Sequence, residues 1–383
     1  MNKQPDPNSY YTLFALSLVN SCGAASLLLA PVIVGGLVST LGFSGQQAGY
    51  IISSELAGLA LAAIPAALWL SRFNWQRVLY VMLVVLIAGN FLTSTLTDYS
   101  AFLIVRFITG FTAGLSLAVS MSVINLTRDP DRKLGFWFSV QLLLTVVGLA
   151  LLPGFILSFG IGGIYALLAA FQFCLLFVVR FVPAGGVVEQ SAQSVSDKPV
   201  LLLALLGFVS IFLFEVAIMG LWTYYERIGN AGGLPAQSIA YALSIGTFVG
   251  FLGSLAAAGL STRFGRLVPI AIGISVAIVS ILILNMDFSL ILFVLSASAF
   301  CFAWYFSLPF LMAAIANIDA SGRLLIFVNF VTGAGLTIGP AVAAKLQTDD
   351  SYEPIIWMGV IALVLSFLLM IRLAVLPVRG AAS

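Results

Sequence analysis

The stretch 201–222 reads LLLALLGFVSIFLFEVAIMGLW and indicates the class of fold. It is long enough to cross the hydrocarbon core of a bilayer as an α-helix, which needs about 20 apolar residues. Its apolar residues are continuous and do not alternate with polar ones, so a helix and not a β-strand is the expected spanning element. Only Glu215 interrupts the stretch with a charge. The stretch therefore predicts a membrane helix with one ionisable group in its middle.

The rest of the chain has the same character. Of its 383 residues, 61% are hydrophobic and only 8% are charged, whereas a soluble domain carries about 25% charged residues. So few charges cannot cover a surface that faces water, and most of the surface is therefore expected to face lipid. After allowance for loops, the length accommodates about twelve spans of roughly 20 residues each. We predict an all-α integral membrane protein embedded in a lipid bilayer.

Polar breaks divide the chain into apolar segments. We expect spans near 11–37, 46–70, 77–97, 99–126, 134–157, 161–182, 200–226, 236–260, 267–285, 288–317, 323–346 and 354–376. The first of these is too long for the apolar part of a cleaved signal peptide, so we interpret it as a span. The stretch 183–199 is the least apolar and has the composition of a flexible linker. It separates two predicted six-helix bundles, 1–182 and 200–383.

The positions of lysine and arginine predict the orientation in the membrane. If both termini are cytoplasmic, the inside segments hold Lys3, Arg72, Arg77, Arg128, Arg132, Lys133, Arg180, Lys198, Arg263, Arg266, Arg323, Arg372 and Arg379. The outside segments hold only Arg227 and Lys345. Because basic residues concentrate in cytoplasmic loops, we expect both termini and the linker in the cytoplasm. The expected location is the inner cell membrane.

The two halves share short patterns at matching positions. Gln46, Tyr50 and Ser53 of the second span match Gln237, Tyr241 and Ser244 of the eighth, and Gly148 with Pro153 in the fifth matches Gly335 with Pro340 in the eleventh. Repeated halves are typical of secondary transporters, which hold their substrate near the bilayer midplane. We interpret the chain as a duplicated six-helix unit suited to alternating access.

Motifs at the ends of several spans resemble the major facilitator superfamily. They are Gly259-Leu-Ser-Thr-Arg263-Phe264-Gly265-Arg266 after the eighth span, the more divergent Leu70-Ser71-Arg72-Phe73-Asn74-Trp75-Gln76-Arg77 after the second, and Arg106-Phe-Ile-Thr-Gly110 in the fourth. The resemblance implies twelve helices in two bundles. It also implies a gating role for Arg72, Arg77, Gly259, Arg263, Gly265 and Arg266. Basic residues at helix ends can pair with the other half and bias which side is open, or they can serve only as cytoplasmic anchors.

Three charged residues lie well inside predicted spans, away from the span ends: Glu55, Arg106 and Glu215. Charge within a membrane is expensive and is a mark of function or of a buried pair. Desolvation favours the neutral form of a carboxyl group, and opening to water on one side favours proton release. We therefore predict proton coupling at Glu215 or Glu55, with Arg106 modulating the carboxyl or holding an anionic group. The alternative is a static pair that fixes helix packing.

Further polar and aromatic residues inside spans are candidates for lining a substrate cavity: Asn20, Gln141, Trp222, Tyr224, Trp304, Tyr305 and Asn329. Aromatic rings bind apolar or ring-bearing solutes and offer a polar edge. For Trp222 and Tyr224, a place in the aromatic belt at the membrane interface is an equal alternative.

Other classes of function fit the sequence poorly. The chain has no histidine, the commonest metal ligand and general base, and no acidic or cysteine-rich cluster, so we expect neither an enzyme nor a metal or cofactor. It lacks the phosphate-binding loop of an ATP-driven pump and any basic run for nucleic acid. We predict a monomeric secondary transporter that moves a small organic solute by alternating access and couples this movement to protons. An efflux antiporter, an organic-acid uptake symporter and an uncoupled facilitator or channel remain open.

Overall fold

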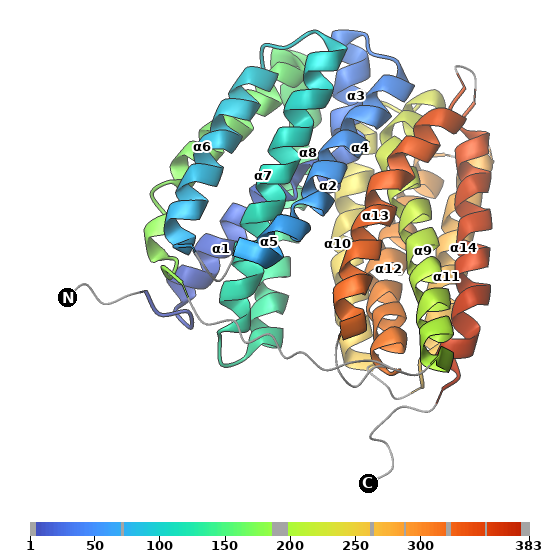
Figure 1. Ribbon diagram of the computed structural model, residues 1–383. Helices are drawn as coiled ribbons and strands as arrows, with labels where there is room; N and C mark the ends of the chain where they lie inside the picture. The colour runs from blue at the N-terminus through green and yellow to red at the C-terminus, as the bar shows by residue number, and fades with distance from the viewer. Residues whose placement is uncertain are drawn as a thin grey trace. The chain divides into compact units, whose positions relative to one another are not determined.

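The computed structural model describes residues 5–69, 73–185, 198–260, 264–286, 289–318, 323–348 and 351–376. Contacts between residues divide the chain into two compact units, Met1–Gln190 (unit 1) and Ser191–Ser383 (unit 2). Within the described ranges the regular structure of both units consists of helices (Figure 1). The predicted linker 183–199 lies mostly outside the described residues.

The helices of unit 1 are α1 (Tyr10–Gly23), α2 (Ala25–Leu28), α3 (Ala30–Leu41), α4 (Gly45–Leu61), α5 (Ala63–Trp69), α6 (Trp75–Thr93), α7 (Tyr99–Asn125) and α8 (Pro130–Leu175), followed by the short 3₁₀ helix η1 (Val179–Phe181). Those of unit 2 are α9 (Lys198–Ala231), α10 (Ala236–Leu260), α11 (Leu267–Leu282), the 3₁₀ helix η2 (Ile283–Asn285), α12 (Leu290–Ala316), α13 (Arg323–Leu346) and α14 (Glu353–Ala374).

Ten helical segments in the described ranges are long and apolar enough to cross a membrane, and two local features reconcile this number with twelve spans. The first predicted span is broken into α1, α2 and α3, with Ala24 and Leu29 between the pieces. The predicted fifth and sixth spans are joined in α8, where Gly160 leaves the helical conformation with φ 65° and ψ −178°. A glycine adopts this backbone conformation readily because it has no Cβ. The twelve-helix arrangement of the predicted fold is thus present, with the first span broken into three pieces, the second divided into α4 and α5 at Ala62, and the fifth and sixth joined.

Polar side chains cap the N-terminal ends of several helices, where the chain enters an apolar run. Ser44 caps α4 by accepting a hydrogen bond from the Gln47 backbone N–H at 3.1 Å, and the Gln47 side chain accepts one from the Ser44 N–H at 3.0 Å. Asp98 caps α7 in the same way through the N–H of Ala101, at 2.8 Å. Such caps satisfy the free N–H groups of the first helical turn. They place the helix starts close to the predicted span boundaries.

Glycines allow the helices of the second and fourth spans to approach closely. A Cβ on Gly110 of α7 would lie 1.9 Å from the Glu55 carbonyl oxygen of α4, and one on Gly58 of α4 would lie 2.2 Å from the Phe107 carbonyl oxygen of α7. In unit 2, α10 and α12 pack in the same manner, because a Cβ on Gly253 would lie 2.6 Å from the Phe302 carbonyl oxygen. Small residues at membrane helix interfaces permit such backbone contact. The two units therefore repeat this helix pair.

A second close pair in unit 2 consists of α9 and α13. A Cβ on Gly335 would lie 2.7 Å from the Cβ of Glu215, and one on Gly339 would lie 2.8 Å from the Gly220 backbone nitrogen. The helices α9, α12 and α13 lie side by side (Figure 1). This packing holds Glu215 in the interior of unit 2.

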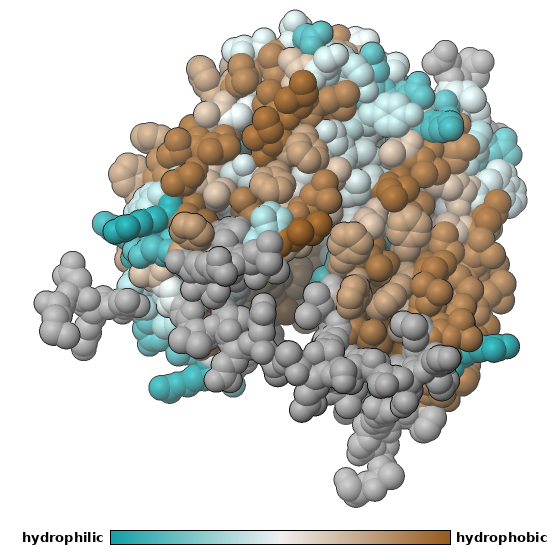
Figure 2. Space-filling model, viewed as in Figure 1, coloured by the Kyte–Doolittle hydropathy of each residue, from teal (hydrophilic) through white to brown (hydrophobic). Residues whose placement is uncertain are grey.

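The surface has the apolar character that the composition predicts. Figure 2 shows mostly hydrophobic residues on the visible face of each unit, with hydrophilic patches chiefly near the ends of helices. Large apolar side chains are well exposed along the helices, for example Leu157 at 82% and Ile291 at 72%. A soluble protein rarely shows apolar patches this extensive, so this surface fits a protein that spans a membrane many times.

We expect Gly110→Ala to destabilise the protein, because the added methyl group would overlap the Glu55 carbonyl oxygen of α4. Overpacking of this kind costs about 1–3 kcal/mol, and thermal unfolding of the purified protein in detergent measures it. Gly135→Ala in α8 is the matched control, since nothing lies within 4 Å of its added Cβ. A Gly110→Ala protein as stable as the control would contradict the close approach of α4 and α7.

Candidate functional site

Arg106 is the centre of a buried polar network in unit 1. Its Nε donates a hydrogen bond to Glu55 Oε2 at 3.0 Å, and its Nη2 forms an ion pair with Glu55 Oε1. Its Nη1 donates to Asn90 Oδ1 at 2.7 Å, and Nη2 also donates to Ser26 Oγ at 3.2 Å. The guanidinium carbon lies 4.7 Å from the centre of the Tyr165 ring. Each of the three guanidinium nitrogens thus donates a hydrogen bond, and the charge is balanced.

The network continues from Asn90 to the far part of α8. The Asn90 side-chain amide donates to Gln172 Oε1 at 2.9 Å. The helices α2, α4, α6, α7 and α8 each supply a residue to this network. The sequence predicted the charges of Glu55 and Arg106, and the structure pairs them. Sequence reasoning missed Asn90 and Gln172, although each is a strongly polar residue in an apolar span.

Asn20 and Gln141, two of the predicted cavity residues, bind each other. The Asn20 side-chain amide donates to Gln141 Oε1 at 2.9 Å. Gln141 also lines a pocket of about 320 Å³ in unit 1. The pocket is lined by Ser21, Ala25, Leu29, Gln141, Leu144, Thr145, Val147, Gly148, Leu151, Leu152, Leu167, Leu168 and Phe171.

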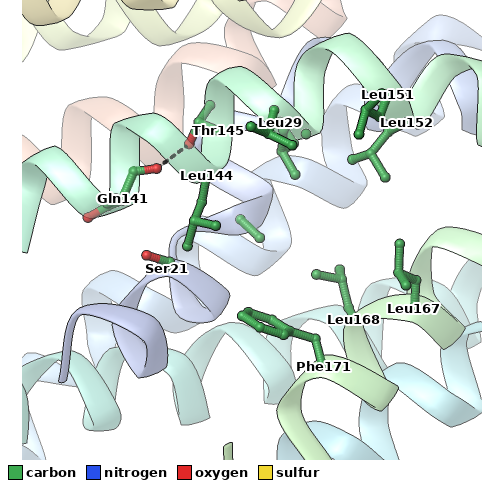
Figure 3. Close-up of a pocket in the computed structure, with 13 residues that line it drawn as sticks. Ser21, Leu29, Gln141, Leu144, Thr145, Leu151, Leu152, Leu167, Leu168 and Phe171 are labelled. Atoms are coloured by element: carbon green, nitrogen blue, oxygen red, sulfur yellow. Dashed lines mark hydrogen bonds between the residues drawn. The ribbon is translucent and has the colours of Figure 1, made fainter. Parts of the chain in front are cut away.

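Figure 3 shows Ser21, Gln141 and Thr145 near one end of this pocket and leucines along the rest. Leu151 is 65% exposed, so the pocket opens on the surface of the unit. A mostly apolar cavity with a few polar groups at one end is typical of a site for a small organic molecule. Asn20 contacts this pocket through Gln141.

Glu215 on α9 is in a different situation from Glu55. Its side chain is 1% exposed, and neither carboxyl oxygen makes a hydrogen bond of regular geometry with a described residue. The indole of Trp304 lies close enough to interact with the carboxyl group, and the Tyr305 hydroxyl is within electrostatic range of it. Burying a carboxylate without a partner is strongly unfavourable. Such a group exists as the neutral acid or with a cation beside it.

An aromatic cluster extends from Glu215 along α9 and α12; we define it as Trp222, Tyr225, Phe300, Trp304 and Tyr305. The ring centres of Trp222 and Trp304 are 6.4 Å apart, those of Trp304 and Tyr305 are 5.0 Å apart, and those of Tyr225 and Phe300 are 5.1 Å apart. The cluster therefore forms a continuous set of rings that begins beside a carboxyl group.

The burial of Trp222 and Tyr224 bears on the alternative of an interfacial belt. Trp222 is 1% exposed and Tyr224 is 0% exposed, whereas belt residues face the lipid headgroups. Trp222 belongs to the aromatic cluster. Tyr224 packs instead on Tyr352, with ring centres 6.2 Å apart.

The predicted gating residues have different environments. Arg77 at the start of α6 and Gly259 at the end of α10 are exposed, whereas Arg266, which precedes α11, is only 8% exposed. The Nε and Nη1 atoms of Arg266 are buried and lack a partner among the described residues, and burial lowers the pKa of its guanidinium. Gly265 has φ 68°, a conformation that favours glycine.

The structure does not bring the three remaining predicted residues to the site. Asn329 on α13 is exposed, and the structure assigns it no contact with the other predicted cavity residues. Arg72 and Arg263 lie outside the described residues.

Sequence comparison identifies the family. A sequence model of the Major Facilitator Superfamily matches residues 13–318, which is most of the chain. The chain belongs to this superfamily. None of the curated protein sequences that were compared with this major facilitator protein matches it.

Solved structures show the same fold. A point mutant of the nucleoside transporter NupG superposes with a TM-score of 0.76 at 17% identity, and the match covers 94% of this chain and 98% of that one. The inward-open xylose transporter XylE from E. coli gives a TM-score of 0.75 at 14% identity, with coverage of 96% and 97%. The major facilitator fold therefore accounts for nearly the whole chain.

Within this major facilitator protein, the two acids that the sequence placed inside spans have different surroundings. Glu55 is neutralised by Arg106 and contributes to a network that joins five helices. Glu215 has no such ion-pair partner among the described residues. We expect the first to serve packing and the second to serve chemistry.

We expect Glu55→Gln to destabilise the protein by about 3–5 kcal/mol, because it leaves the buried charge of Arg106 without its counter-ion. The double variant Glu55→Gln/Arg106→Gln removes both charges and is expected to recover much of this loss. Thermal unfolding of the two single variants and the double variant in detergent gives the coupling energy. Strictly additive losses would contradict the ion pair.

Proposed function

We propose that this protein is a secondary active transporter that moves a small organic solute by alternating access and couples this movement to protons at Glu215. Membership of the Major Facilitator Superfamily supports membrane transport. The observation that carries the coupling is the buried carboxyl group of Glu215, which makes no hydrogen bond of regular geometry and no ion pair with a described residue.

The coupling follows from the energetics of burial. A carboxyl group surrounded by apolar helices keeps its proton, because an isolated negative charge is poorly stabilised there. When one side opens and water or a polar solute reaches the group, the ionised form becomes accessible and the proton leaves to that side. Proton loading and solute movement are linked in this way because both depend on which face is open.

The same reasoning makes Glu55 a weaker candidate for proton coupling. Its carboxylate receives two contacts from Arg106, and an arginine next to a carboxylate favours the ionised form. Arg106 is also a poor holder of an anionic solute, because its donors are already used by Glu55, Asn90 and Ser26. Uptake of an organic acid is therefore less well supported than transport of a neutral or cationic solute.

The environment of Arg266 supports a conformational role for the predicted gating residues. Two of its guanidinium nitrogens are buried without a partner in the described part of the chain. A buried guanidinium usually makes charge-assisted hydrogen bonds, so we propose that Arg266 forms them in another state of the transport cycle. Arg72, Arg77 and Arg263 are proposed to act in the same way at the helix ends.

We further propose that the protein is a monomer of the inner cell membrane with both termini and the linker 183–199 in the cytoplasm. The distribution of basic residues supports this orientation: Arg227 and Lys345 are the only basic residues in the segments assigned to the outside. Because basic residues favour the cytoplasmic side, the asymmetry between the two sets of segments carries the assignment.

We expect Glu215→Gln to abolish solute-driven proton movement in proteoliposomes, because glutamine cannot release a proton. The experiment imposes a pH gradient, reads lumenal pH with a dye and supplies a panel of solutes. The panel contains nucleosides and pentoses, which the two structurally similar transporters carry according to their names, and small organic amines.

Glu226→Gln is the matched control, because Glu226 is a partly buried acid on the same helix. This variant is expected to retain proton movement. If Glu215→Gln and the wild type moved protons equally with the same solute, coupling at Glu215 would be wrong. Saturable solute flux without proton movement in the wild type would instead indicate an uncoupled facilitator.

A reporter fused after α14 tests the orientation. We expect a green fluorescent protein at this position to fluoresce and an alkaline phosphatase to be inactive, because the first folds in the cytoplasm and the second requires export. Fusions in the segment between α6 and α7 are expected to give the opposite result. Active phosphatase after α14 would reverse the proposed topology.

A further inference from the structure

We infer that the solute is an organic cation with an apolar or aromatic body, and that it binds beside Glu215 and the aromatic cluster in exchange for the proton on that carboxyl group. The inference deepens the proposed function and rests on it for the transport step. The binding step stands on the geometry of unit 2 alone.

The charge of the site is the first argument. Glu215 is almost fully buried, and neither of its carboxyl oxygens makes a hydrogen bond of regular geometry or an ion pair with a described residue. Such an oxygen pair attracts a hydrogen-bond donor or a positive charge. The hydroxyl of Thr332 on α13 is also buried without a partner in the described part of the chain. Thr332 lies three residues before Gly335, which packs on the Cβ of Glu215, so the two residues share a face of α13.

The second argument is the kind of surface that adjoins this charge. Trp304 interacts with the Glu215 carboxyl group and lies 6.4 Å from Trp222 in ring centres. Tryptophan is the side chain whose ring face attracts cations most strongly. A carboxyl group next to several aromatic rings therefore recognises a cation that carries an apolar body. A small inorganic cation would contact only the carboxyl oxygens, so the rings would not contribute to its binding.

The third argument is that no unpaired positive charge lies well inside the described spans. Arg106, the one arginine near the middle of a described span, is neutralised by Glu55 and its nitrogens are all engaged. Glu226 and Arg227 lie near the end of α9 and Arg266 precedes α11, so the other charges buried without a partner among the described residues are at helix ends. Among the charged groups well inside the described spans, Glu215 is thus the one without an ion-pair partner, and its charge is negative when it is ionised.

Exchange of the cation for the proton keeps the site neutral. In the empty site the proton occupies the Glu215 carboxyl group, and as the cation enters, this proton leaves to water and the carboxylate pairs with the cation. The charged and titratable groups on the surrounding helices do not replace Glu215 in this exchange. Tyr305 and Cys301 of α12 are neutral near pH 7, and the described charges of α13 and α14 lie at the helix ends: Lys345, Glu353 and Arg372.

The test compares two ions of the same shape and opposite charge. Tetraphenylphosphonium and tetraphenylborate are titrated into the purified full-length protein in nanodiscs, and intrinsic tryptophan fluorescence reports occupancy. We expect saturable binding of the phosphonium, at least tenfold tighter than that of the borate, because the site supplies a charge-assisted contact. We also expect binding of the phosphonium to weaken as the pH falls and to release a proton in weakly buffered solution.

Variants separate the parts of the site. Glu215→Gln is expected to weaken phosphonium binding about tenfold or more and to remove its dependence on pH. Trp304→Leu is expected to weaken it about three- to thirtyfold and to keep the pH dependence, because it removes only the ring. Glu226→Gln is the control and is expected to bind like the wild type. Each variant is first checked for monodisperse folding by size exclusion and thermal unfolding.

The outcomes distinguish this inference from the proposed function. Equal binding of the two ions, no saturable binding of the phosphonium, or unaltered binding by Glu215→Gln overturns the inference, even if another solute shows proton-coupled flux through Glu215. Selective, Glu215-dependent and pH-dependent binding of the phosphonium supports it. If such binding occurs while no solute moves protons in proteoliposomes, the binding site is confirmed and the proposed coupling fails.

Discussion

Hydrocarbon cannot hydrogen-bond a charged side chain, so the pair of Arg106 and Glu55 must be satisfied by the protein itself. Unit 1 meets this requirement with partners from three further helices: Ser26 of α2, Asn90 of α6 and the ring of Tyr165 of α8. The close contact of Gly110 with the Glu55 carbonyl oxygen brings α4 and α7 near enough for the pair to form. The hydrogen bonds of Arg106 and the backbone packing of α4 on α7 thus depend on each other. The broken first span and the far part of α8 supply further residues to the same network.

Unit 2 uses the same helix packing for a different chemical result. The glycine contacts between α10 and α12 correspond to those between α4 and α7, yet no ion pair accompanies them among the described residues. In unit 2 the acid, Glu215, is instead on α9. Gly335 of α13 packs against its Cβ, and aromatic rings lie next to it. Duplicated halves that share a scaffold can therefore specialise, one for rigidity and one for the exchange of charge.

The sequence predicted most of the fold because continuous apolar runs specify helices directly. The predicted span 236–260 has the same bounds as α10. The break of the first span and the joint at Gly160 were missed, because an average over an apolar run does not register a change at a single backbone angle. At the site, the three charges could be identified because they are rare in such runs. Their partners could not be identified, because Asn90 and Gln172 meet only when α6 and α8 have a particular rotation about their axes, and the sequence alone does not determine that rotation.

The joint in α8 has a consequence for how the chain enters the membrane. Between the fifth and sixth spans the backbone turns at Gly160, with Phe159 and Ile161 on either side. No polar loop separates the two spans, so nothing in this connection would keep one span at the membrane surface before the other inserts. The two spans are thus expected to insert together as a helical hairpin during synthesis, and any polar insertion at Gly160 would turn one concerted step of biogenesis into two.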